Sequence, residues 1–245
     1  MQRDPILQIG AEGLASTDEK MQSLINRIVN AETPGFRSSD VTIRSFPLEL
    51  EAAEKKLSTQ SPKVDGTFYN YAQGTFVRTG KNTDFAIGTP GFFVLFCPWG
   101  EGYSRDGRFM VNPEGEVVTV VGGYKLMGQN GPILVSPGSR IDISETGELL
   151  VDSEVVDKIR VVDFEDNQSL ESLNGVIFKD PTGNLALKEV DNPKILQGYV
   201  ESSNASVVDQ MVEMIYINRI YDTNTKIIQT RDGNLSQAIG MGRVQ

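Results

Sequence analysis

The sequence predicts an α+β fold in which N- and C-terminal α-helices pair as a coiled coil around a β-rich, antiparallel central domain. Three observations predict it: an apolar seven-residue repeat over residues 7–28, a second one over 207–235, and short strand-like runs between turns in the middle. A seven-residue repeat places a narrow apolar seam along one side of a helix, and that seam needs a partner. We therefore divide the chain into an N-terminal helix (1–36), a linker or transition region (37–74), a β-rich domain (75–195) and a C-terminal helix (196–245).

The two repeats define a predicted assembly seam. Pro5 suits the first turn of the N-terminal helix, and Asn204 or Ser206 suits the N-cap of the C-terminal one. Polar residues in the second repeat, such as Asn218 and Thr225, cost stability but select register and partner. The alternative is that both helices are core helices of a single globular domain. The seam consists of Leu7, Leu14, Met21, Ile28, Val207, Met211, Met214, Tyr221, Ile228 and Leu235.

The region between the first helix and the β-domain predicts a short helix, a loop and strand-like segments in turn. Residues 47–57 predict a short helix, because Glu51 and Lys55 are correctly ordered for an ion pair one turn apart. Residues 59–66 are polar and contain proline, which favours a loop. The aromatic run 68–71 indicates either a strand or a contact with a neighbouring subunit, and 74–79 alternates like a strand.

The middle of the chain predicts many short strands. Gly, Pro and Asn-rich turns separate the apolar runs, and this pattern is typical of an antiparallel sandwich or a partly closed barrel. The expected strands are 85–87, 92–96, 109–111, 117–121, 133–135, 140–143, 149–151 and 159–164.

Composition excludes several classes of function. The chain has 245 residues and a net charge of −10, which argues against binding nucleic acid or an anionic membrane surface. It has no apolar run long enough to span a membrane and no signal-peptide pattern, which taken alone predicts a cytoplasmic protein. Cys97 is the only cysteine and lies in an apolar run, so we expect a buried, inert thiol. There is no histidine, so histidine-based nucleophile systems and histidine-ligated metal sites are excluded.

The remaining motifs do not predict catalysis. Residues 142–147 begin like a calcium loop, but Ser153 stands where a bidentate glutamate is needed, so a hairpin turn is expected. The tripeptide 105–107 resembles an adhesive motif, although a turn with its own Arg–Asp pair is the preferred interpretation. The carboxylates between 154 and 166 indicate a solvated face rather than a glycosidase pair. We predict no enzyme activity, no catalytic residue, no cofactor and no metal.

Five short motifs, in order along most of the chain, resemble those of one family. They follow the first helix, open two strand regions, and begin and continue the second helix. In this pattern and spacing the chain resembles the bacterial flagellar basal-body rod and hook axial proteins. The short region 37–74 makes it most similar to the distal-rod or rod (FlgF/FlgG-type) proteins, since the hook protein has a much larger middle insertion. The motif residues are Asn30, Thr33, Pro34, Gly35, Phe36, Gly91, Phe92, Phe93, Arg105, Asp106, Gly107, Gly198, Tyr199, Asn204 and Arg219.

The resemblance implies a structural subunit of the flagellar rod, which assembles with copies of itself and other rod or hook axial proteins in a helical array that transmits torque. It also implies contact with the flagellar export apparatus, export without a cleaved signal, and a location in the rod in the periplasmic space, in place of the cytoplasmic expectation. No nucleic acid and no membrane span are expected. The alternatives are a hook-type axial protein, a secreted β-domain adhesin oligomerised by its helices, and a carboxylate enzyme built on the β-domain.

Overall fold

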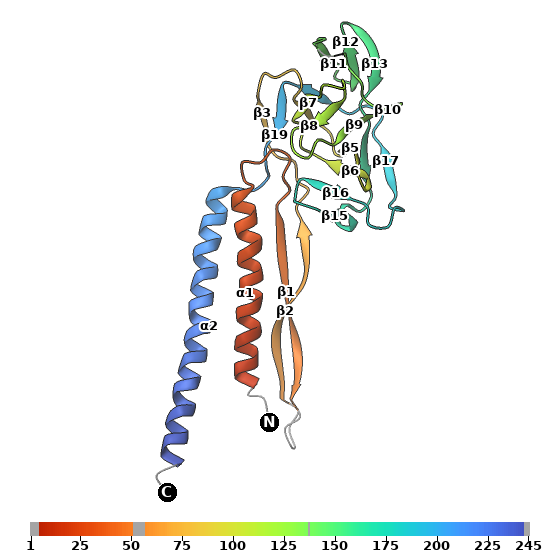
Figure 1. The fold of residues 1–245 in the computed structure, drawn as a ribbon. Helices are drawn as coiled ribbons and strands as arrows, with labels where there is room; N and C mark the ends of the chain where they lie inside the picture. The colour runs from red at the N-terminus through yellow and green to blue at the C-terminus, as the bar shows by residue number, and fades with distance from the viewer. Residues whose placement is uncertain (1–4, 51–56, 137, 243–245) are drawn as a thin grey trace. The chain divides into compact units, whose positions relative to one another are not determined.

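A computed structural model describes residues 5–50, 57–136 and 138–242 (Figure 1). The chain forms two compact units. The helical unit contains α1 (Pro5–Val29), β1 (Ser39–Leu50), most of β2 (Leu57–Tyr69) and α2 (Val207–Gly242). The β unit contains residues 30–38 and 69–205.

Within the helical unit, α1 lies between α2 and the β1–β2 hairpin (Figure 1). On the α2 side, Arg27 Nη2 lies 3.1 Å from Glu213 Oε2, and Lys20 Nζ lies 3.5 Å from Glu213 Oε1. A Cβ atom added to Gly10 would lie 3.0 Å from Cγ1 of Ile228, so the two helices approach closely at that point. On the hairpin side, the Ser23 hydroxyl donates to the Ser39 carbonyl at 3.0 Å.

The predicted coiled coil of the terminal helices is wrong. Met211 and Tyr221, two predicted seam residues, are exposed, whereas Gln210 and Ile217 are the buried side chains among those described in α2. Because α1 packs against both α2 and β1, its apolar residues are divided between two neighbours rather than gathered in one seam. Of the other predicted seam residues, Leu14, Met21, Ile28, Val207, Met214 and Ile228 are half-buried, and the side chains of Leu7 and Leu235 are outside the described part of the structure.

The hairpin corrects two further predictions. The expected helix over 47–57 is wrong at both of its described ends, because 47–50 belong to β1 and 57 begins β2; residues 51–56 are outside the described part. The expected loop over 59–66 lies within β2. The two strands form a two-stranded sheet of their own, so each strand has one unpaired edge.

The β unit is built around a ten-stranded antiparallel sheet in the order β15-β16-β6-β5-β9-β8-β7, with β10 on β9 and with β14 between β5 and β17. A three-stranded sheet β11-β12-β13 and the pairs β4-β18 and β3-β19 complete the unit. The strands are β3 (Phe76–Arg78), β4 (Phe85–Ile87), β5 (Phe92–Cys97), β6 (Gly100–Ser104), β7 (Phe109–Val111), β8 (Val117–Thr119), β9 (Lys125–Gly128), β10 (Gly131–Pro132), β11 (Ile141–Ile143), β12 (Glu148–Val151), β13 (Glu154–Lys158), β14 (Val161–Phe164), β15 (Glu171–Ser172), β16 (Ile177–Lys179), β17 (Leu187–Glu189), β18 (Ile195–Gln197) and β19 (Tyr199–Glu201).

Strand β5 supplies both apolar cores of the β unit. Successive side chains of a strand point to opposite faces of the sheet. Accordingly Phe93, Leu95 and Cys97 belong to one buried cluster, while Phe92 and Val94 belong to the other. An apolar run without polar alternation is therefore what a strand with two buried faces requires.

The segment that begins like a calcium loop is a hairpin turn, as predicted. It joins β11 to β12, and Gly147 occupies the turn with a φ of 88°. Among the described residues there is no group of three or more histidine, cysteine, aspartate or glutamate side chains that could hold a metal ion. Nor does any helix in the described part have both the length and the apolar character needed to span a membrane.

The Cys97 thiol is buried, as expected, and its burial raises its pKa to about 11. We expect the native protein to react with a thiol-directed disulfide reagent at pH 8 at least about a hundredfold more slowly than the urea-unfolded chain, because little thiolate is present and access requires opening of the sheet. Absorbance of the released thiol measures both rates. Equal native and unfolded rates would show that Cys97 is accessible.

Candidate functional site

Three of the family-motif segments, 30–37, 103–109 and 197–204, meet at one buried carboxylate in the β unit. Glu201, at the end of β19, accepts from Arg37 Nη2 at 2.7 Å through Oε1 and from Arg105 Nη1 at 3.1 Å through Oε2. The side chains of Glu201 and Arg37 are each 1% exposed, and that of Arg105 is 6% exposed. We call these three residues the buried charge junction.

Backbone groups complete the hydrogen bonding of the junction. Glu201 Oε1 also accepts from the Gly74 amide at 2.7 Å, and the Glu201 carbonyl accepts from the Gly35 amide at 2.8 Å. Arg105 donates to the carbonyls of Ile87 and Thr89 at 3.1 and 2.8 Å. The junction therefore joins chain segments that are 96 and 164 residues apart. Removing its carboxylate would leave two buried cations without a shared counter-charge.

The electrostatics of Arg105 reflect its burial. Loss of solvation lowers the pKa of its guanidinium to about 10, and the neighbouring Glu201 carboxylate opposes that shift. Arg105 thus remains charged at neutral pH, so the junction contains two cations and one shared anion.

Two motif glycines permit close backbone approaches beside the junction. Gly35 has a φ of 73°, and a Cβ atom there would lie 2.2 Å from the Asp106 amide nitrogen. A Cβ atom on Gly107 would lie 1.5 Å from the Phe85 carbonyl oxygen. Only glycine fits at either position without a shift of backbone, because no side chain can move aside.

Asn204 bridges two loops rather than capping α2. Its Oδ1 accepts from the Ser38 amide at 2.9 Å, and its Nδ2 donates to the carbonyls of Asn70 and Ala72 at 2.6 and 3.0 Å. The capping position belongs to Ser206, whose hydroxyl accepts from the Asp209 amide at 3.4 Å.

The expected Arg–Asp pair within residues 105–107 is wrong. Arg105 turns inward to Glu201, and Asp106 instead binds Arg108, whose Nη2 lies 2.6 Å from Asp106 Oδ2. Both arginines lie next to the same turn, but only the buried one belongs to the junction.

The other predicted motif residues lie around this junction, in the cores or away from both. Phe36 is buried against Gly175, Thr33 bonds Asn30 through its hydroxyl at 3.3 Å, and Gly198 has a φ of 77°. Arg219 lies on α2 and is exposed.

The sequence did not predict the ion pair between Arg37 and Glu201. Two motifs contain an arginine and a third contains a glutamate, and these opposite charges were an available signal. The remaining motif residues are Pro34 and Tyr199, which are half-buried; Gly91, which directly precedes β5; and Phe92 and Phe93, which lie in the two different cores.

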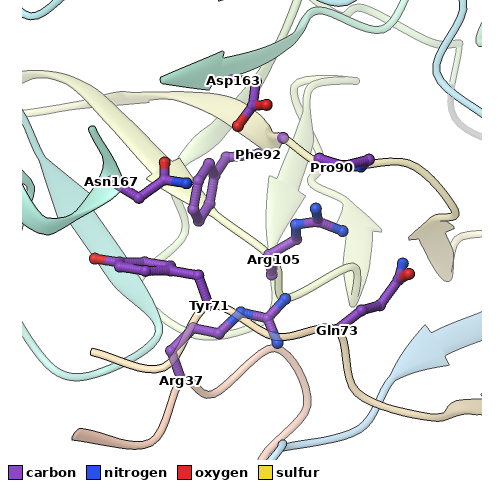
Figure 2. Close-up of a pocket in the computed structure, with 9 residues that line it drawn as sticks. Arg37, Tyr71, Gln73, Pro90, Phe92, Arg105, Asp163 and Asn167 are labelled. Atoms are coloured by element: carbon purple, nitrogen blue, oxygen red, sulfur yellow. The ribbon is translucent and has the colours of Figure 1, made fainter. Parts of the chain in front are cut away.

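A pocket of about 130 Å³ opens beside the junction (Figure 2). Both arginines line it, together with Tyr71, Phe92 and Asn167 among others. The Arg105 guanidinium carbon lies 5.7 Å from the centre of the Phe92 ring, and the Tyr71 ring meets Phe92 edge-on at 5.9 Å.

The buried charge junction joins distant segments of the β unit, and in the helical unit α1 packs against α2. Both features fit a structural protein. The comparisons with known proteins agree. Residues 196–241 match the family model described as the flagellar basal body rod FlgEFG protein C-terminal.

Similarity to curated proteins extends over most of the chain. It is 30% identical over 230 residues to the flagellar basal-body rod protein FlgF of Caulobacter vibrioides, covering 92% of each chain. It is 29% identical over 244 residues to the FlgF of Salmonella typhimurium, covering 93% of this chain and 94% of the relative. It is 27% identical over 262 residues to the rod protein FlgG of Buchnera aphidicola subsp. Schizaphis graminum, covering 95% and 98%. The chain belongs to the flagellar basal-body rod protein family and is a structural rod subunit of the flagellar basal body.

Proposed function

We propose that the chain assembles side by side with copies of itself and with other rod and hook axial proteins, in a helical array that transmits torque. The observation that carries this proposal is an uncovered apolar face on α2. It consists of Val208, Met211, Val212, Ile215 and Tyr216.

The face lies on the side of α2 away from α1. Val208, Val212 and Tyr216 are 71%, 64% and 65% exposed, while Gln210 and Ile217 are buried. At about 100° per residue, Val208 and Ile217 point in opposite directions around the helix. The outward face is therefore free for a neighbouring subunit while the inward face packs within the chain.

Because this face is apolar, contact with another protein surface is more favourable for it than exposure to water. A contiguous apolar stripe on a monomer typically marks an interaction surface. Contact between unlike surface patches, repeated from chain to chain, produces an open helical array rather than a closed ring. Met211, part of the predicted assembly seam, contributes to this face, so we propose that it meets a neighbour rather than α1.

We also propose that the chain reaches the rod in the periplasmic space through the flagellar export apparatus without a cleaved signal, and that it binds no nucleic acid. Family membership supports the route, and the net charge of −10 disfavours a phosphate backbone as partner.

The change Val212→Asp should raise the concentration needed for assembly about tenfold or more, because it places a carboxylate where about 1.5–3 kcal/mol of apolar burial is expected. Sedimentation and electron microscopy of the purified chain with its rod partners would measure this. Gln229→Asp adds the same charge at an exposed position further along α2, where the residues one turn away (Thr225, Lys226, Asp232 and Gly233) are not apolar, and should assemble like the wild type. Discrete trimers in place of rod-like polymers, or equal assembly of Val212→Asp, would contradict the proposal.

A further inference from the structure

Strand β3 forms an exposed, basic edge of the β unit. Within the described part of the chain it pairs with β19 and with no other strand, so its second edge has backbone groups without a ladder partner. Such an edge is a ready site for another strand. Phe76, Val77 and Arg78 are all exposed, and Lys81 follows them at the surface. We call residues 76–81 the basic edge, since they combine apolar surface with two cations.

The start of β13 forms a second exposed edge, which is acidic. Among the described strands β13 pairs with β12 alone, and the β9–β10 turn bonds only its last two residues. Val155 and Val156 are exposed, and the carboxylates of Asp152 and Glu154 stand beside them at the surface. We call residues 152–156 the acidic edge, since they combine apolar surface with two anions.

The two edges are complementary in charge as well as in apolar surface. No ion pair between described residues involves Arg78, Lys81 or Glu154. Within the chain these charges are therefore not used to hold two segments together. Contact between the basic edge and the acidic edge would bring opposite charges together and cover valines on both sides, whereas contact between two edges of the same kind would set like charges against each other.

The positions of the two edges determine what kind of contact they can make. Figure 1 shows β3 and β13 on different sides of the β unit, and they belong to separate sheets. One chain cannot bring its own two edges together, so the partner of each edge belongs to another molecule. Contact between two unlike surfaces of the same chain passes from copy to copy and builds an open array.

We propose that the basic edge of one copy docks along the acidic edge of the next copy, with the valines of the two strands in contact and Arg78 beside Glu154. This inference rests on the proposed assembly of the chain with copies of itself. It adds a contact made by the β unit to the contact that we assign to the outward face of α2.

Reversing one charge on either edge tests the contact. Arg78→Glu and Glu154→Arg should each raise the concentration at which the full chain self-assembles about tenfold, because each sets like charges against each other between copies. Sedimentation and electron microscopy of the purified chain measure this. Lys188→Glu is the matched control, because Lys188 is also an exposed cation on a short strand but belongs to the ten-stranded sheet rather than to either edge. It should assemble like the wild type.

An equal mixture of Arg78→Glu and Glu154→Arg distinguishes a contact between copies from damage within one chain. If the two variants alternate in the array, opposite charges face each other at every contact. The mixture should therefore self-assemble at a concentration close to that of the wild type, and so should a chain that carries both changes. Local unfolding caused by either substitution would not be repaired by mixing.

Self-assembly of both single variants at the wild-type concentration would overturn the inference, and so would the absence of rescue in the mixture or of any self-assembly by the wild type. These failures can be told apart from failure of the proposed function. That function is tested by Val212→Asp with the rod partners present, and its result does not depend on either edge of the β unit.

Discussion

Replacing Glu201 by glutamine should lower the free energy of unfolding of the β unit by about 3–5 kcal/mol, because two buried guanidinium groups lose their shared counter-charge. Glutamine keeps the size of the side chain, so the loss reports charge rather than packing. Urea unfolding followed by tryptophan fluorescence measures it, since Trp99, the one tryptophan of the chain, lies in the β unit.

The matched control is Glu189→Gln. Glu189 also accepts from an arginine, with Arg160 Nε 3.0 Å away, but its side chain is 55% exposed. An exposed ion pair contributes at most about 1 kcal/mol, so this variant should unfold close to the wild type. A loss below about 1 kcal/mol for Glu201→Gln, or equal losses for the two variants, would show that the buried carboxylate is not needed to hold the segments together.

The strands of the β unit could be predicted where burial and pairing coincide. The runs 85–87 and 109–111 are strands β4 and β7 with the expected bounds. The run 133–135 is different: Ile133 and Val135 are buried, but the segment makes only an isolated bridge through Leu134. An apolar pattern therefore predicts which residues are buried, but not whether their backbone pairs with another strand. Strand β6 was missed for the converse reason, because its glycines and glutamate give no apolar signal although β5 and β16 pair with it on both sides.

The helical unit shows a second limit of sequence reasoning. A seven-residue repeat leaves open whether the inner position falls three or four residues after Val207, and the structure buries Gln210 rather than Met211. Because Gln210 is polar, the apolar pattern did not indicate that this residue occupies the inner position. The pairing of β1 with β2 was not predicted, because the sequence between 47 and 57 favours a helix. Local propensity is weak against strand pairing and the packing of β1 on α1.

The buried charge junction is the clearest case of long-range information. Arg37 and Glu201 are 164 residues apart, and nothing local in either segment marks them as partners. Motif resemblance located both segments, but only the fold shows that the motifs are near one another because a carboxylate, two guanidinium groups and two close glycine contacts hold them there.

Replacing Gly35 by alanine should destabilise the β unit by about 3 kcal/mol or more, which combines backbone strain with overpacking. The residue has a φ of 73°, and a Cβ atom would lie 2.2 Å from the Asp106 amide nitrogen and 2.5 Å from the Arg105 carbonyl carbon. Those atoms belong to backbone, so the segment that carries Arg105 would have to move. Urea unfolding followed by Trp99 fluorescence, together with the Nε–H resonance of Arg105, measures both consequences.

Gly80→Ala separates the two causes. Gly80 has nearly the same φ, 74°, yet a Cβ atom there would meet nothing within 4 Å. Gly80→Ala should therefore lower the free energy of unfolding by only about 1 kcal/mol, because it introduces backbone strain alone. A larger loss at Gly35 than at Gly80 isolates the close approach of the two motifs as the reason for glycine, because conformational freedom is needed equally at both positions. Equal losses would instead mean that the turn geometry alone requires glycine at residue 35, and that the segment at Arg105 can shift to admit a side chain.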